Sequence, residues 1–146
     1  MHLTKYSDYA LRTLIYLAVK DTVPATIQEI AGKYGISRNH LVKVVHQLSI
    51  AGLIHTERGR GGGIRLGKPA SEINIGTVVR LTEEDLDLAE CFNGSKNQCL
   101  ISGNCRLQGA LNQALSAFMA ELDRYTVADF TTADTGLAQL FASPTG

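Results

Sequence analysis

The chain has 146 residues, of which 45% are hydrophobic and 19% are charged. This composition is typical of one globular domain, or of one small domain with an extension, and it contains no run of about 20 apolar residues that could span a membrane. Three cysteines are an odd number and too few for a secreted disulfide scaffold, so we expect a cytoplasmic protein with reduced thiols.

The formal net charge of zero conceals two halves of opposite sign. Residues 1–68 contain ten Lys and Arg but only four Asp and Glu, a net charge of +6. Residues 69–146 contain four Lys and Arg against ten Asp and Glu, a net charge of −6. The basic half indicates a polyanionic partner, although charges on solvated faces also need no partner at all.

A helix-turn-helix is predicted near the start of the chain. Residues 3–20 form the first predicted helix, because apolar side chains recur there at helical spacing. Thr26 and Glu29 have the spacing of a capping box, which opens a short second helix that ends near Gly35. A third helix is predicted over residues 38–50. Two helices joined by a tight, glycine-containing turn are typical of this motif, although other helical hairpins share it.

The outward face of the third helix is rich in hydrogen-bond donors and lacks carboxylates. It offers Arg38, Asn39, His40, Lys43, His46 and Gln47, with Ser37 as the predicted N-cap. Of these residues we expect Ser37, Arg38, Asn39, His40 and Lys43 to contact DNA. Arg38, Asn39 and Lys43 are the candidates for reading base edges, since such side chains pair with the edges of G or A.

A basic β-hairpin is predicted over residues 53–66, where two short strand-like runs flank the glycine-rich stretch 58–63. Arg58, Arg60 and Arg65 make this hairpin cationic and are expected to contact phosphates or the minor groove. A nucleotide-binding loop is disfavoured, because neither Gly-Lys-Ser/Thr nor a helix follows the glycines. A basic hairpin directly after a helix-turn-helix is typical of the wing of a winged helix.

These elements predict a mainly α fold with four parts. They are a winged helix-turn-helix DNA-binding domain over 1–81, a loop with all the cysteines over 82–105, a dimerisation helix over 106–130 and a flexible tail over 131–146. Little of the chain remains to cover the apolar stripe of the long helix, so we expect a second copy of the chain to cover it. A two-fold dimer also matches a palindromic DNA duplex. The alternative is a helix buried within one chain.

The cysteines suggest a metal centre that lacks one protein ligand. Cys91, Cys99 and Cys105 share one loop and are separated by seven and then by five residues. An iron–sulfur cluster tolerates such spacings, whereas zinc ligands are more often paired two to four residues apart, and unligated redox thiols are a third interpretation. The residues that could complete the site are His2, Asp8, His55, Asp87 and Glu90. By itself Asp8 reads more simply as a surface ion pair with Arg12.

Four stretches of the sequence resemble a known family: residues 3–12, 37–43, 58–71 and the cysteine loop 91–105. They are similar to the nitric-oxide-sensing repressors of the winged-helix family that also contains IscR. The resemblance covers about residues 1–130. It implies a transcriptional repressor, not an enzyme, that binds an operator in double-stranded DNA as a homodimer and responds to nitric oxide.

The same resemblance implies a ligand set. Cys91, Cys99 and Cys105 would bind a [4Fe–4S] cluster, and Asp8 of the partner subunit would be the fourth ligand. In the IscR-like branch a histidine three residues after the last cysteine completes the site, whereas this chain has Gln108 there. The gap between Cys91 and Cys99 is longer than the resemblance leads us to expect.

Two alternatives remain open at this stage. One is an iron- or redox-sensing regulator of the same family that uses a [2Fe–2S] cluster or free thiols. The other belongs to a different class, a small iron–sulfur electron carrier, and it would leave the basic hairpin and the helix-turn-helix without a role.

Overall fold

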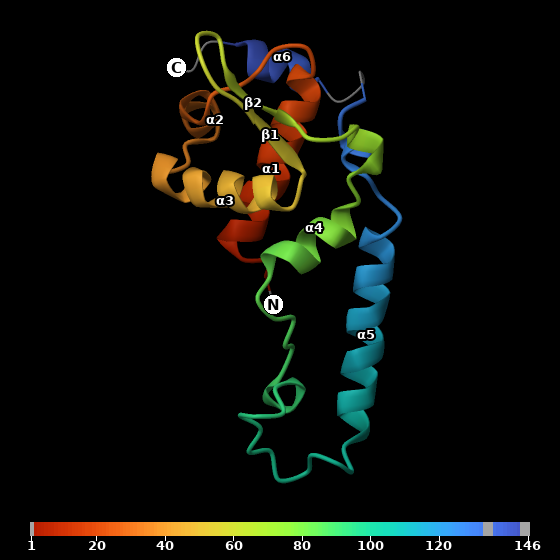
Figure 1. Cartoon of the computed structure of the whole chain (residues 1–146). Coiled ribbons are helices and arrows are strands. Elements are labelled where there is room, and N and C mark those ends of the chain that lie inside the picture. Colours follow the sequence, from red (N-terminus) through yellow and green to blue (C-terminus); the bar gives the residue numbers. More distant parts are fainter. Residues whose placement is uncertain (1, 133–135, 144–146) are drawn as a thin grey trace.

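The computed structural model describes residues 2–132 and 136–143, and two parts are distinct in it (Figure 1). The body comprises residues 2–82, 123–132 and 136–143, and the arm comprises residues 83–122. The elements are α1 (Lys5–Lys20), α2 (Ile27–Tyr34), α3 (Arg38–Ile50), β1 (Ile54–Glu57), β2 (Gly63–Leu66), η1 (Ala70–Glu72), α4 (Ile75–Thr82), η2 (Glu90–Phe92), α5 (Arg106–Leu122), η3 (Val127–Phe130) and α6 (Leu137–Ala142).

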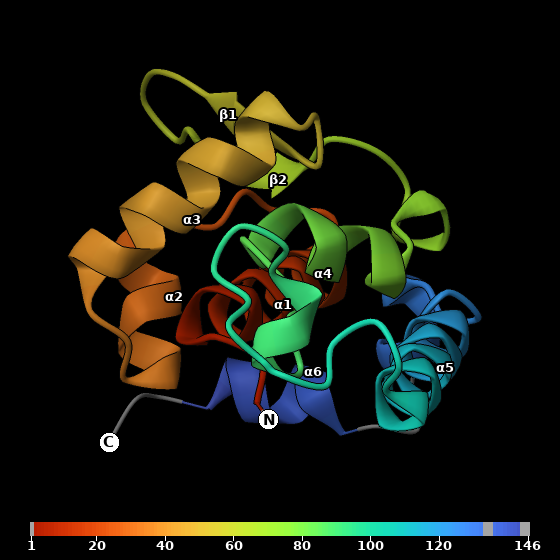
Figure 2. The same cartoon turned by 90° about the horizontal axis from the view of Figure 1, so that it is seen from below.

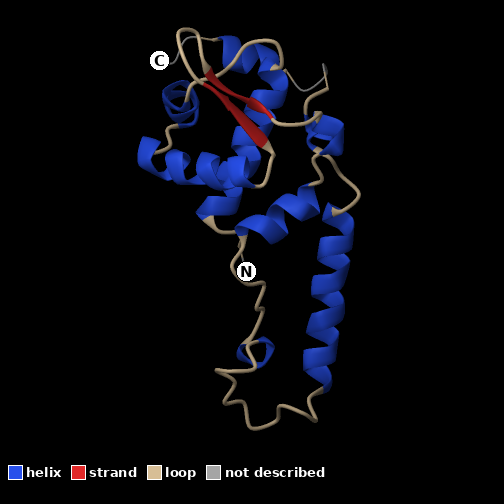
Figure 3. Cartoon of the chain, viewed as in Figure 1, coloured by secondary structure: helices blue, strands red, loops and turns tan. Residues whose placement is uncertain are grey.

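The core of the body surrounds α1. Leu14 and Tyr16 of α1 are fully buried, and α3 turns Leu41 and Val44 into the same apolar cluster. Removing these side chains from water is the main contribution that holds the two helices together. Helices dominate the described residues, and the sheet consists of β1 and β2 alone (Figure 3). The predicted fold class, mainly α with a winged helix-turn-helix, is confirmed.

Local sequence explains where α2 begins and where it ends. Thr26 and Glu29 form the predicted capping box at the start of α2, and Gly35 ends α2 with a φ of +63°. That left-handed conformation favours glycine and turns the chain sharply into α3. Ser37 occupies the N-cap position of α3 as predicted, but its side chain makes no capping hydrogen bond.

The wing is an antiparallel pair of strands. Ile54 of β1 lies opposite Leu66 of β2, and Glu57 lies opposite Gly63. The chain before α2 adds a bridge to the outer side of β2, between Ala25 and Ile64. A Cβ atom on Gly63 would lie 2.6 Å from the carbonyl oxygen of Ala25, so the close approach of these two segments requires a glycine.

The arm is exposed along most of its length. The loop after α4 runs away from the body, and α5 returns beside it (Figure 1). In the 17 residues of α5, all of which the structure describes, only Met119 is buried. Seen from below, α2 and α3 lie at one edge of the molecule and α5 at the opposite edge, so α5 leaves the face of α3 uncovered (Figure 2).

The C-terminal region differs from the prediction in two respects. The long helix ends at Leu122, and residues 127–130 form a separate 3-10 turn that begins with a capping box between Thr126 and Asp129. The tail expected over 131–146 contains α6, whose Phe141 ring packs 4.6 Å from the ring of Tyr16. An aromatic contact with the core therefore orders this part of the tail, while residues 133–135 and 144–146 lie outside the described residues.

Candidate nucleic-acid interface and cysteine arm

The exposed face of α3 carries the residues predicted to contact DNA. Ser37, Arg38, Asn39, His40 and Lys43 are all exposed, because the opposite face of α3 packs in the core. These side chains can donate hydrogen bonds to base edges or to phosphates.

A search for membrane-spanning helices found none among the described residues.

Aromatic contact with α1 constrains one of these residues. The ring of His40 lies 6.3 Å from the ring of Tyr9 in α1, measured between centroids. Tyr9 directly follows Asp8 in the sequence. A displacement of this part of α1 would therefore change the contact that positions His40 in the N-terminal half of α3.

The three arginines of the wing divide into two kinds. Arg58 and Arg60 are exposed at the tip, where they can approach phosphates. Arg65 is half-buried and lies 2.8 Å from a carboxylate oxygen of Glu57, and it also donates to the carbonyl of Asp21. Arg65 thus cross-links the two strands of the wing, a use that the sequence pattern did not reveal.

The arm holds all three cysteines as free thiols. Cys91 lies in η2 and Cys105 at the N-cap of α5, both half-buried, whereas Cys99 is exposed. The side chain of Gln108 donates to the carbonyl of Cys91 over 2.9 Å and ties the two ends of the loop together. Gln108, which stands where the resemblance to the IscR-like branch would imply a histidine, therefore has a structural role.

The described residues do not form a ready-made site for a single metal ion. Among residues 2–132 and 136–143, no three His, Cys, Asp or Glu side chains gather closely enough to hold one ion. The thiol donors nevertheless suit an iron–sulfur cluster, in which separate irons take the cysteines and the ligands stand farther apart. Three soft donors in one loop, lacking a fourth, match the chemistry of such a cluster.

Asp8 does not join the cysteines of its own chain. Its carboxylate lies 2.7 Å from Nε of Arg12, so the surface pair predicted from the sequence is formed. Asp8 belongs to α1 in the body, whereas the cysteine loop occupies the end of the arm (Figure 1). Within one chain the structure therefore does not bring the four predicted ligands together.

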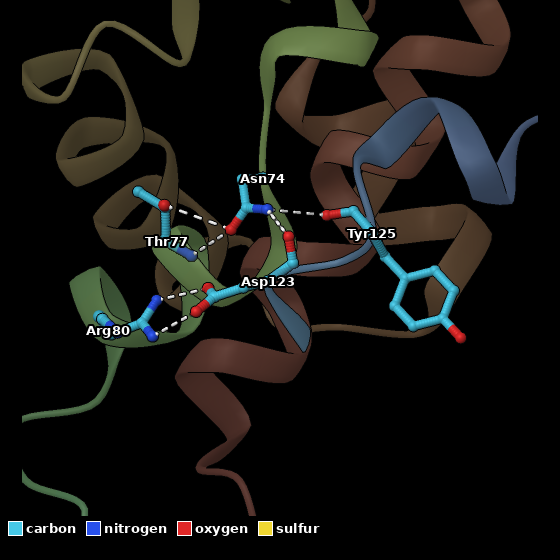
Figure 4. Close-up of polar contacts among 5 residues, drawn as sticks. All are labelled: Asn74, Thr77, Arg80, Asp123 and Tyr125. Carbon is cyan, nitrogen blue, oxygen red and sulfur yellow. Dashed lines mark hydrogen bonds and ion pairs between the residues drawn. The ribbon is translucent and has the colours of Figure 1, made fainter. Parts of the chain in front are cut away.

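A polar clamp attaches the end of α5 to α4 (Figure 4). The guanidinium of Arg80 donates to both carboxylate oxygens of Asp123, over 2.6 and 2.7 Å, and this contact lowers the pKa of Asp123. Asn74 caps α4 by accepting from the amide of Thr77 and also donates to the carbonyls of Asp123 and Tyr125. The clamp fixes the base of the arm.

One side chain at the interface lies differently from the prediction. Gln47 was expected on the outward face of α3, but its amide is half-buried and bonded to α1 and α4. Its partner in α1 is the hydroxyl of Tyr6, and its partner in α4 is the carbonyl of Leu81. Helical spacing places Gln47 at the border of the exposed face, and only the tertiary contacts show which way it turns.

Comparison with known proteins agrees with this arrangement. The model of the Rrf2 family, described as an iron-dependent transcriptional regulator, matches residues 3–133. The HTH-type transcriptional regulator NsrR of Bacillus licheniformis is 53% identical over 130 residues, which cover 88% of this chain and 91% of the relative. NsrR of Bacillus subtilis is 52% identical over 130 residues, covering 88% and 89%.

A solved structure supports the fold independently. IscR of T. potens superposes with a TM-score of 0.70 at 22% identity, covering 89% of this chain and 85% of that protein. The relatives are transcriptional regulators, so the predictions of a DNA-binding regulator and against an enzyme are confirmed, and an electron carrier is excluded. The chain belongs to the Rrf2 family of transcriptional regulators and is similar to its NsrR members.

Proposed function

We propose that this regulator is a nitric-oxide-sensing repressor that acts in the cytoplasm as a homodimer on a palindromic operator. The observation that carries the proposal is the position of the cysteines, which share one loop at the end of an arm that extends from a DNA-binding body (Figure 1). The choice of nitric oxide as the signalling molecule rests on the similarity to proteins named NsrR, because that resemblance implies a response to nitric oxide.

The outer face of α5 supports the homodimer. Leu107, Ala110, Ala114 and Ala117 recur at helical spacing, and all four are exposed although the stripe is apolar. The body covers a different face of α5, the one that buries Met119. A helix of 17 residues with one buried side chain needs a further surface to pack against, and a second α5 related by a two-fold axis provides it.

The proposed ligands are Cys91, Cys99 and Cys105 of one chain, with Asp8 of the partner subunit completing a [4Fe–4S] site. Asp8 is half-buried on α1, and among the described residues its ion-pair partner is the surface residue Arg12. Breaking this exposed pair so that Asp8 can bind a cluster costs little free energy. A bound cluster would supply iron atoms that can react with nitric oxide. In this arrangement Asp8 connects the arm of one chain to the body of the other.

The role of the chain is to keep two recognition helices at the correct separation. Helices that enter successive major grooves must lie about 34 Å apart, so a small shift of one body relative to the other weakens binding strongly. Loss of the Asp8 ligand removes the connection between one arm and the opposite body. A coupling of about 1–3 kcal/mol between the two sites suffices for a switch.

A second candidate function uses the same residues. The exposure of Cys99 favours a regulator that senses oxidants or iron through free thiols or a [2Fe–2S] cluster. This candidate predicts that the affinity for DNA changes on thiol oxidation and does not change on addition of nitric oxide.

The first experiment is anaerobic purification followed by DNA titration. We expect visible absorption typical of an iron–sulfur protein that bleaches with nitric oxide, together with loss of operator binding. Cys99→Ala should be colourless, whereas Ser95→Ala in the same loop should resemble the unmodified protein. Operator binding that survives complete bleaching would contradict the repressor mechanism, and colourless protein that still binds DNA would favour the thiol candidate.

Subunit mixing tests the origin of the fourth ligand. A dimer of one Asp8→Asn chain and one Cys99→Ala chain contains one complete site only if Asp8 acts across the dimer. We expect mixed dimers to regain absorption that neither homodimer shows, with Asp21→Asn, at the exposed end of α1, as the control that behaves like the unmodified chain. Failure of the mixed dimers to recover any cluster would refute a ligand from the partner subunit.

A further inference from the structure

A single side-chain amide joins three helices beneath the recognition surface. The carbonyl oxygen of Gln47 in α3 accepts from the hydroxyl of Tyr6 in α1 over 2.9 Å. Its amide nitrogen donates to the main-chain carbonyl of Leu81 in α4, also over 2.9 Å. A side-chain amide can accept through its oxygen and donate through its nitrogen without carrying a charge. Gln47 therefore connects the recognition helix to α1 and to α4.

The contact with α4 lies where the arm begins. Leu81 is in the last turn of α4, where carbonyls have no partner within the helix, and Gln47 satisfies one of them. Two residues later Glu83 starts the segment that leads to the cysteines. A movement of the arm at its root would therefore displace an atom to which α3 is directly bonded.

The contact with α1 lies close to Asp8. Tyr6 is two residues before Asp8, and its hydroxyl also contacts the carbonyl of Lys43 over 3.2 Å. The same turn of α1 is bonded to the arm, because the carboxylate of Glu83 accepts from the amide and the hydroxyl of Thr4 over 2.8 and 3.1 Å.

We propose that Gln47 is the positioning residue that couples the arm to the recognition helix. Gln47 itself faces inward and lines a groove of about 880 Å³ with Tyr6, Leu81 and Glu83, so its role differs from that of the base-reading residues. The inference rests on the proposed function in one respect, namely that the state of the cysteines changes the affinity for DNA. It adds the residue through which that change reaches α3.

The experiment measures a ratio of operator affinities. For each variant the dissociation constant for operator DNA is determined with the cluster loaded and with the cluster removed, and the ratio of the two is the coupling. Gln47→Met keeps the length of the side chain and removes both hydrogen bonds. We expect it to reduce the coupling at least about fivefold while leaving the absorption spectrum unchanged. Gln139→Met, an exposed position on α6, is the matched control and should keep the full coupling.

A second readout needs no cluster. In cluster-free Gln47→Met, amide hydrogen exchange should be faster both in the second half of α3 and at residues 81–83, and it should be unchanged in α2. Tyr6→Phe removes one hydroxyl and should reduce the coupling by a smaller factor. If Gln47→Met does not fold, the ratio of operator affinities and the hydrogen exchange are measured on Tyr6→Phe instead, with Tyr125→Phe as its control.

Three results would overturn the proposal. The coupling of Gln47→Met could stay within about twofold of the unmodified value, or DNA binding could weaken equally with and without the cluster, which is the signature of a purely structural role. Both results leave the proposed function intact. If the unmodified protein itself has a coupling near one, the proposed function fails and the inference fails with it.

Discussion

The body and the arm use their apolar residues in opposite ways. In the body, α1 buries Leu14 completely at the centre of a shared core. In the arm, Leu100 and Leu107 are 97% and 64% exposed. The body buries its apolar side chains within one chain, as a stable domain must. The arm instead exposes apolar side chains that no other described part of the chain covers. In the proposed function, DNA recognition is therefore built into each chain, whereas sensing is completed only in the homodimer.

The largest expected effect tests the self-sufficiency of the body. Leu14→Ala should lower the free energy of unfolding by about 2–5 kcal/mol, because it leaves a cavity among fully buried neighbours. Leu100→Ala makes the same chemical change in the arm and should alter stability by less than about 0.5 kcal/mol in cluster-free protein. Urea denaturation at a fixed protein concentration measures both, and similar losses would show that the arm has a core of its own.

The next effect concerns the uncovered face of α5. Ala114→Arg places a charge in the apolar stripe and should raise the dissociation constant of the dimer at least about 100-fold, equivalent to about 2.7 kcal/mol. Asn112→Arg puts the same side chain on another face of α5 and should leave the dimer intact. Sedimentation over a range of concentrations distinguishes them, and a dimer that tolerates Ala114→Arg would have to use a different surface.

A smaller effect separates the two kinds of arginine in the wing. Arg60→Ala should weaken binding to all DNA sequences and reduce the slope of log affinity against log salt by about one, because it removes one phosphate contact. Arg65→Ala should also loosen the hairpin, since Arg65 pairs with Glu57. Titrations at several salt concentrations, on cognate and unrelated duplexes, test this difference. A defect of Arg60→Ala confined to cognate DNA would contradict the wing assignment.

The smallest effect is a pH dependence within the body. Burial by itself raises the pKa of Glu29, but hydrogen bonds from Lys20 and Tyr16 outweigh it, so the pKa is lowered overall. A carboxylate with a lowered pKa stabilises the fold above its ordinary pKa, and this contribution disappears as the pH falls through the folded-state value. The midpoint of thermal unfolding should therefore drop more steeply on acidification than in Glu29→Gln. Parallel curves would show that Glu29 contributes nothing to the acid sensitivity.

The sequence predicted the local features of the body better than its long-range contacts, and particular residues show why. The capping box of Thr26 and Glu29 and the strand pair around the glycines are set by neighbours a few positions away. Gln47 and Arg65 were expected to face outward, yet they bond to residues 34 and 44 positions away. No local pattern contains those partners, so neither role was predictable.

The sequence by itself determined the helix-turn-helix, the wing and the grouping of three thiols in one loop, because each depends on spacing along the chain. Only the tertiary structure decided that α6 packs its Phe141 on Tyr16, that Arg80 clamps Asp123, and that the cysteine loop lies beyond the reach of its own body (Figure 1). The physical reason is the same in each case. Periodicity specifies which face of an element is apolar, but which surface covers that face depends on contacts between distant segments.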